Sequence, residues 1–298
     1  MMGTNRLVGD KLVISLAYCL IGLFALVCLY PLILTLSVSF SAEQEVTRNG
    51  YSILPQSPTI DTYKYIFVNS GAKILKSYGV TIFITVVGTI SALLITSMIS
   101  FAISIKKLRY RNIIAFISNF TIIFSAGLIP WYMVSVNYYG LKNSILALII
   151  PSVFSVWNMF LMRTFFASIS PSMYEAAEID GANYFTIYVK IALPLSKTAL
   201  LTVGLMYALN YWNDWWNALI FINEKDLFPL QYYLYSILSN VNAISSGRIP
   251  TGASGSITLP AETVKMAVTV ITIGPIIFLY PYIQKYFVHG IMAGAIKE

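Results

Sequence analysis

YGVTIFITVVGTISALLITSMISFAISIKKLRYR, residues 78–111, joins an uncharged apolar segment to a basic one. Residues 78–105 contain no charged side chain, and a helix that crosses the hydrocarbon core of a bilayer needs about 20 mostly apolar residues. Residues 106–111 then place four cations in six positions, with no acid among them. Because cytoplasmic links of membrane proteins are enriched in Lys and Arg, we expect a membrane-spanning helix that ends on the cytoplasmic side.

The composition of the whole chain extends this interpretation. Of its 298 residues, 57% are hydrophobic and 10% are charged, whereas soluble domains carry about 25% charged residues. Such a chain cannot cover a water-facing surface, which excludes a soluble globular enzyme and a disordered protein. Six segments are long and apolar enough to span a membrane: 12–40, 78–105, 113–136, 145–166, 198–222 and 265–284. We therefore predict an all-α membrane protein with six transmembrane helices.

The basic link sets the orientation of these helices. If it is cytoplasmic, both termini of a six-span chain are cytoplasmic as well. Residues 1–77 then hold the first transmembrane helix and an external segment, 78–284 form the transmembrane domain, and 285–298 form a cytoplasmic tail. The formal net charge of +7 is explained by anchoring to membrane lipid, and we infer no nucleic-acid partner from it.

The cytoplasmic link between the fourth and fifth spans, residues 170–197, has a sequence unlike the other links. Ser170 and Pro171 predict a helix start, with Ser172 and Glu175 as an alternative capping box, and Gly181 predicts a left-handed helix end. A second helical segment, 183–192, should stop near the following proline. On these arguments alone, the short acidic helix is either a knob that fits a cytoplasmic partner or an ordinary solvated loop helix.

The residues of this link carry a resemblance to a known family. The matching elements are Glu175-Ala176-Ala177, Asp180-Gly181-Ala182, and Ile191 with Leu193-Pro194-Leu195. They resemble the EAA loop in the membrane subunits of ABC importers, in which a short helix docks into a groove of the ATP-hydrolysing subunit. The resemblance implies the same coupling role for Glu175, Ala176, Ala177, Asp180 and Gly181. It makes Glu175 the anchoring carboxylate and Gly181 the corner residue.

The likeness continues in Gly140-Leu141-Lys142-Asn143-Ser144, Tyr211-Trp212-Asn213, Leu259-Pro260 and the tail 285–297. These segments are similar to the carbohydrate branch, most of all to the second permease subunit of maltose-type importers and to oligosaccharide permeases of the LplC/YtcP type. The resemblance implies a type I ABC importer permease fold in a bacterial cell membrane. It also implies a second permease subunit that is a different chain, two ATP-hydrolysing subunits, and an extracellular or periplasmic sugar-binding protein. ATP and Mg would then belong to the ATPase subunits, and no cofactor to this chain.

A polar pattern marks the fifth predicted span. Asn210, Asn213, Asp214 and Asn217 follow the spacing i, i+3, i+4 and i+7, which predicts one face of a helix. A carboxylate at this depth is costly and normally faces a cavity or a partner. Together with Trp212, Trp216 and Tyr132, this face suits a sugar pathway, because amides and carboxylates bind hydroxyl groups and aromatic rings cover sugar C–H surfaces. Interfacial tryptophans and asparagine bonds between packed helices are the competing explanations.

The sequence lacks the motifs of an enzyme. It contains no G-x-x-x-x-G-K-[ST] phosphate loop, one histidine (His289), and no cysteine pair with ligand spacing. We therefore predict a chain that neither hydrolyses ATP nor binds a metal. The resemblance implies that this chain is the permease of an ATP-driven, binding-protein-dependent importer, which moves a sugar, expected to be an oligosaccharide, into the cell and is coupled to the ATPase through the EAA loop. The alternative is an ion-gradient-driven secondary transporter that uses Asp214.

Overall fold

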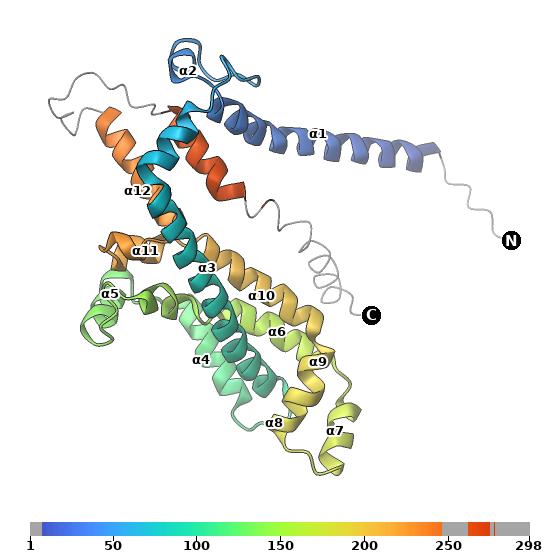
Figure 1. Ribbon diagram of the computed structural model, residues 1–298. Helices are drawn as coiled ribbons and strands as arrows, with labels where there is room; N and C mark the ends of the chain where they lie inside the picture. Colours follow the sequence, from blue (N-terminus) through green and yellow to red (C-terminus); the bar gives the residue numbers. More distant parts are fainter. Residues whose placement is uncertain (1–7, 246–261, 275–276, 278–298) are drawn as a thin grey trace. The chain divides into compact units, whose positions relative to one another are not determined.

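The computed structural model describes residues 8–245, 262–274 and 277. The described part of the chain is mostly helical and contains no strand (Figure 1). The chain divides into two compact units, residues 1–71 with 237–274 and residues 72–236 with 275–298. In chain order the elements are α1 (Val8–Ser39), α2 (Glu43–Asn49), α3 (Asp61–Ser104), α4 (Arg111–Ile123), α5 (Leu128–Asn137), η1 (Ile145–Leu148), η2 (Ile150–Ser152), α6 (Val156–Ser168), α7 (Pro171–Ile179), α8 (Tyr184–Ile187), the π-helical turn η3 (Tyr188–Ala192), α9 (Leu193–Leu195), α10 (Lys197–Trp212), α11 (Trp216–Phe221), η4 (Lys225–Leu227) and α12 (Leu230–Ser245). Residues 262–274 are also helical.

The first unit is held together by the start of its last helix. The carboxylate of Glu43, in α2, accepts hydrogen bonds from the backbone N–H of Glu262 at 3.0 Å and from that of Thr263 at 2.8 Å. It also accepts the Thr263 hydroxyl at 2.7 Å. These are the donors that a helix leaves unsatisfied in its first turn, so Glu43 caps the helix at 262–274. The Thr62 and Thr263 hydroxyls bond to each other at 3.0 Å.

The second unit packs around α3, α6 and α10. Its main apolar cluster contains Phe101 of α3, Phe166 of α6 and Tyr207 of α10. Several buried polar groups beside this cluster are paired, because unpaired polar groups are costly in an apolar interior. The hydroxyl of Tyr207 bonds with that of Thr96 at 2.6 Å, and Ser100 donates to the carbonyl of Met159 at 2.8 Å.

The structure confirms part of the predicted set of spans. Two helices are long and apolar enough to cross a membrane, within Val13–Ser39 and Ser70–Ser104. Counting three bent helix pairs as one span each raises the number to five among the described residues. The pairs are Arg111–Ile123 with Leu128–Asn137, Ile145–Ser152 with Val156–Ser168, and Tyr184–Leu195 with Lys197–Trp212, bent by 115°, 51° and 83°. The sixth predicted span, 265–284, lies partly outside the described residues.

Three predicted spans are wrong as single straight helices. The segment 113–136 breaks at 124–127, where Gly127 adopts a positive φ of 85°. The segment 145–166 starts with the turns η1 and η2 and bends before α6 begins at Val156. The segment 198–222 breaks at 213–215, between α10 and α11. A further difference is that α3 begins at Asp61, well before residue 78, so it continues through the boundary at residue 77. Local polar and glycine residues end helices that hydrophobicity alone would extend.

The helix α1 presents apolar side chains on all its faces. Residues 13–33 are all exposed within the chain, and large side chains such as Tyr18 and Phe24 are more than 70% exposed. A helix that is hydrophobic all around is stable only inside lipid or against other protein. The first predicted span therefore has the surface of a membrane helix.

Candidate functional site

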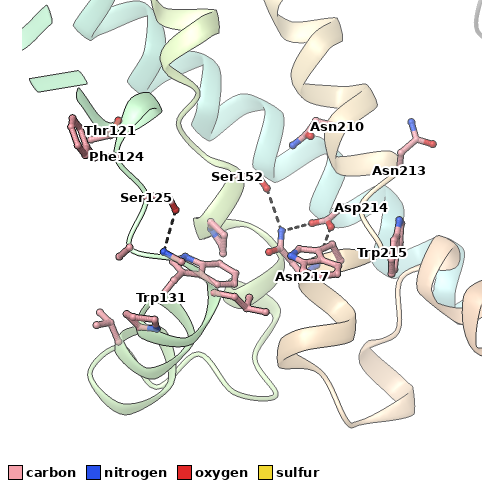
Figure 2. Close-up of a pocket in the computed structure, with 17 residues that line it drawn as sticks. Thr121, Phe124, Ser125, Trp131, Ser152, Asn210, Asn213, Asp214, Trp215 and Asn217 are labelled. Atoms are coloured by element: carbon pink, nitrogen blue, oxygen red, sulfur yellow. Dashed lines mark hydrogen bonds between the residues drawn. The ribbon is translucent and has the colours of Figure 1, made fainter. Parts of the chain in front are cut away.

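A cavity of about 940 Å³ lies where three helix breaks meet in the second unit (Figure 2). One wall is the link between α4 and α5, a second is η2, and the third is the break between α10 and α11. The residues that line it are Thr121, Phe124, Ser125, Ala126, Gly127, Leu128, Pro130, Trp131, Val134, Pro151, Ser152, Asn210, Asn213, Asp214, Trp215, Trp216 and Asn217. This combination of aromatic walls and several polar groups is typical of a small-molecule site.

The break between α10 and α11 results from its own polar side chains. Asn213 donates through its amide to the carbonyl of Leu209 at 2.9 Å. Asp214 accepts the backbone N–H of Asn217 at 3.1 Å, in the first turn of α11. Asn and Asp compete with the helical backbone in this way, and they favour helix ends over helix interiors. The prediction that the four polar residues share one face of a continuous helix is therefore wrong, because they surround a helix end.

The polar centre of the cavity is a bonded group of three side chains. The amide of Asn217 donates to the second carboxylate oxygen of Asp214 at 2.5 Å and to the Ser152 hydroxyl at 3.3 Å. Figure 2 shows these bonds converging on Asn217, which is 7% exposed. The group holds the Asp214 carboxylate in place at the cavity wall, beside Trp215 and Trp216. A fixed carboxylate can accept hydrogen bonds from hydroxyl groups, and the neighbouring indole rings can cover the C–H surface of a ring that carries those hydroxyl groups.

Five of the seven predicted pathway residues line this cavity. They are Asn210, Asn213, Asp214, Trp216 and Asn217. The other two, Tyr132 and Trp212, are not among its lining residues. Tyr132 stacks on Phe221 with ring centroids 5.8 Å apart, and Trp212 lies 6.5 Å from the ring of Tyr78.

Sequence reasoning did not assign the wall formed by the α4–α5 link or by η2. Trp131 and Ser152 are cavity residues from these two elements. The sequence Ser125-Ala126-Gly127-Leu128-Ile129-Pro130 interrupts an apolar segment with glycine and proline. That interruption was the available signal, because such residues inside a membrane helix mark a break that lines a cavity or packs against protein.

A second candidate site is the link between α6 and α10, which begins with α7. Ser170 occupies the N-cap position and Pro171 begins the helix, as predicted, although the Ser170 hydroxyl bonds to that of Ser172 and makes no cap bond. Gly181 has a φ of +81°. Its N–H donates to the carbonyl of Glu178 at 3.0 Å, and the N–H of Ala182 donates to that of Ala177 at 2.9 Å. This pair of bonds is a Schellman end, so the predicted glycine corner is confirmed.

One side of α7 packs against the unit and the other is exposed. Tyr174 donates to the carbonyl of Phe166 at 3.2 Å and contacts the ring of Phe101 edge-on at 6.0 Å. Burial raises the pKa of Tyr174 to about 12. The exposed residues include Glu175, Ala176, Ile179 and Asp180. Ile179 is 86% exposed, which leaves an apolar side chain at the tip of an acidic helix.

A single ion pair joins α7 to the basic link after α3. The Lys107 ammonium donates to the carboxylate of Glu178 at 2.5 Å. This bond lowers the pKa of Glu178 and raises the pKa of Lys107. Glu178 therefore has a cationic partner, and Glu175 and Asp180 are the acids left on the exposed side. Among the described residues, no group of three or more His, Cys, Asp or Glu is placed to hold a metal ion.

A helical membrane chain that has a polar cavity at its helix breaks and an exposed helix paired to a basic link has the features of a transporter subunit. Comparison with known proteins narrows this class. The chain is 36% identical over 288 residues to the polygalacturonan/rhamnogalacturonan transport system permease protein YtcP of Bacillus subtilis, covering 97% of this chain and 99% of that one. It is 35% identical to protein LplC of the same organism over 273 residues, with 91% and 90% covered. No protein-family model matches the chain.

The fold is also similar to that of a chain of a known transporter. A crystal structure of a bacterial ABC transporter involved in the import of the acidic polysaccharide alginate contains a chain that is 33% identical, with a TM-score of 0.80 over 96% of this chain and 100% of that one. The chain therefore belongs to the permease subunits of carbohydrate ABC transporters. ATP hydrolysis in such systems is carried by a separate subunit, and an ion-gradient-driven transporter finds no support among these relatives.

Proposed function

We propose that this permease moves an oligosaccharide into the cell and that the cavity between the three helix breaks forms part of the pathway. The observation that carries the proposal is the bonded group of Asp214, Asn217 and Ser152, which faces the same cavity as Trp131 and Trp215. The carboxylate and amide groups accept and donate hydrogen bonds to sugar hydroxyls, and the indoles supply flat apolar surfaces. The relatives' names refer to polygalacturonan, rhamnogalacturonan and arabinooligosaccharides.

The test is a change of charge at the cavity with little change of shape. We expect Asp214→Asn to lower uptake of labelled galacturonan- and arabinan-derived oligosaccharides by about tenfold, the effect of about 1.4 kcal/mol. Uptake is measured with the complete importer in proteoliposomes. The matched control is Glu224→Gln, which removes one negative charge from an exposed residue outside the cavity lining. Equal uptake by the two variants would show that Asp214 is not part of the sugar pathway.

The helix α7 is the proposed contact with the ATPase. Its exposed side offers Glu175, Ala176 and Asp180, and the apolar Ile179 stands beside them. Small side chains permit close approach, and an exposed apolar side chain next to an acid suits a groove with an apolar floor and a basic rim. Gly181 and Ala177 form the corner that orients this helix. In this proposal α7 transmits nucleotide-driven motion of the ATPase to the helices around the cavity.

The proposed assembly has a second permease subunit of different sequence, two ATP-hydrolysing subunits that bind ATP and Mg, and an external sugar-binding protein. The proposed topology has six spans in a bacterial cell membrane, with both termini in the cytoplasm. Residues 1–77 then hold the first span and an external segment, 78–284 the transmembrane domain, and 285–298 a tail that lies outside the described residues. The basic residues 106–111, directly after the long helix α3, support this orientation. Labelling of a cysteine introduced at Lys106 from either side of sealed vesicles tests it.

A further inference from the structure

A second cavity, of about 360 Å³, lies at the opposite end of α3 from the start of the helix, beside the basic link. Its floor is formed by Phe101 and Tyr188, which are 5% and 6% exposed. Its sides are apolar and open, with Met98 and Phe185 more than half exposed. The sugar pathway does not use this cavity, since the two share no lining residue.

The mouth of this cavity is positively charged. Lys107 and Arg109 line it, and no acidic side chain is among its lining residues. Lys106 and Arg111 flank them in the same link. Glu178 binds Lys107 from α7, so one of the four cations is paired. Arg109 is exposed and lies with its guanidinium 5.7 Å from the centre of the Tyr110 ring.

An apolar floor below a cationic mouth matches one kind of ligand at a membrane surface. The phosphate of an anionic lipid pairs with Arg or Lys, and its acyl chain covers apolar side chains. Clusters of four or more Lys and Arg directly after a membrane helix on the cytoplasmic side attract anionic lipids. A soluble phosphate compound would match the cations but would leave the exposed aromatic and aliphatic sides uncovered.

We propose that this cavity binds an anionic phospholipid of the inner leaflet, with the headgroup at Arg109 and Lys107 and an acyl chain against Phe101, Tyr188 and Phe185. The site rests on the proposed cytoplasmic orientation of the link. Because Lys107 also holds Glu178 of α7, the bound headgroup lies next to the ion pair that joins the basic link to the proposed ATPase contact. The bound lipid therefore stabilises the basic link, and this link holds α7 through the Lys107–Glu178 ion pair.

The test uses the complete importer in nanodiscs that contain phosphatidylglycerol and a photoactivatable phosphatidylglycerol with the reactive group in its acyl chain. Mass spectrometry then locates the labelled peptides. We expect labels within residues 98–109 and 184–188, competed by unlabelled phosphatidylglycerol but not by phosphatidylcholine or inorganic phosphate. Arg109→Gln should lower this labelling at least threefold. The control Lys142→Gln removes an exposed cation from outside the cavity and should leave labelling unchanged.

A second variant distinguishes lipid binding in the cavity from general attraction of the cations to the membrane surface. Ala102→Leu fills the apolar lining while every cation remains, and it should lower labelling as Arg109→Gln does. Equal labelling by a phosphatidylcholine probe, or unchanged labelling in both variants, would overturn the proposal. Labelling that appears in the isolated permease but not in the complete importer would show that a protein subunit covers the cavity, which also overturns it. Normal sugar uptake without labelling here refutes the lipid site alone, whereas loss of the Asp214 effect refutes the sugar pathway alone.

Discussion

The ring of Tyr211 in α10 lies directly against the backbone of Gly88 in α3. A Cβ atom built on Gly88 would be 2.5 Å from Cζ of Tyr211 and less than 3 Å from two other ring atoms. Tyr211 is fully buried, and its hydroxyl donates to the carbonyl of Ile149 at 2.9 Å. The ring therefore connects α3 to the segment before η2, which forms one wall of the candidate sugar cavity. The absence of a side chain at residue 88 makes this connection possible.

Gly88→Ala should destabilise the protein. The overlap with the Tyr211 ring costs about 1–3 kcal/mol of overpacking, which exceeds the gain in helix propensity of at most about 1 kcal/mol. We expect a lower midpoint of thermal unfolding in detergent. Gly79→Ala is the matched control, because residue 79 lies in the same helix with nothing within 4 Å of its added Cβ. An equal midpoint for the two variants would contradict the close contact.

The conformation of Gly181 leads to a prediction about coupling. Its φ of +81° is strained for a residue with a side chain, by about 1–2 kcal/mol, although no atom lies within 4 Å of an added Cβ. Gly181→Ala should therefore weaken sugar-stimulated ATP hydrolysis and co-purification of the ATPase subunits. Gly181→Asn is the control, since asparagine tolerates this conformation, and it should retain more of both. Equal losses would point to the size of the side chain instead of the backbone.

The Glu43 cap predicts local stability in the first unit. Glu43→Ala removes the acceptor of the Glu262 and Thr263 N–H groups, which should cost about 0.5–2 kcal/mol, the usual effect of losing a helix cap. Hydrogen–deuterium exchange of residues 262–274 should become severalfold faster. Glu45→Ala removes a neighbouring carboxylate that accepts from Asn49 of the same helix. If both variants exchange alike, the cap contributes nothing.

Tyr51 predicts a loss of stability in alkali. Its hydroxyl donates to Glu262 at 2.5 Å, and this bond, with burial and the charges of Glu262 and Glu43, raises the pKa of Tyr51 to about 12. Since the folded-state pKa exceeds the ordinary value of 10.0, the contribution is complete below pH 10 and is lost as the pH rises towards 12. Tyr51→Phe should flatten the fall of the unfolding midpoint between these values. Tyr139→Phe, at a residue that is 72% exposed, is the control, and the same flattening there would refute the assignment.

The contact between Tyr51 and Glu262 also makes stability depend on pH in acid. Hydrogen bonds from Lys265 and Tyr51 lower the pKa of Glu262 below its ordinary value of 4.5. A carboxylate with a lowered pKa adds stability above its unfolded-state pKa, and that stability is lost as the pH falls through the folded-state value. The first unit should therefore be most stable between these acid and alkaline limits.

The sequence predicts the helix α7 better than it predicts the cavity at the helix breaks. The start of α7 at Pro171 and its end at Gly181 were predictable, because proline at the first helical position and a glycine that adopts positive φ act within a few residues. The cavity was only partly predictable. The polar residues 210–217 were identified, but their assumed helical face was wrong, since hydrophobicity averaged over a span does not register an Asn and an Asp that bind their own backbone.

The sequence alone determined the all-helical membrane class, the basic link and the acidic loop helix, because each depends on composition or on a short run of neighbouring residues. Only the tertiary structure decided which polar residues share a cavity. Ser152, Trp131 and Asp214 lie far apart in the chain and meet at three separate helix breaks. It also decided that Lys107 pairs with Glu178, 71 residues away. Such contacts depend on how helices pack against one another, which no local pattern of residues specifies.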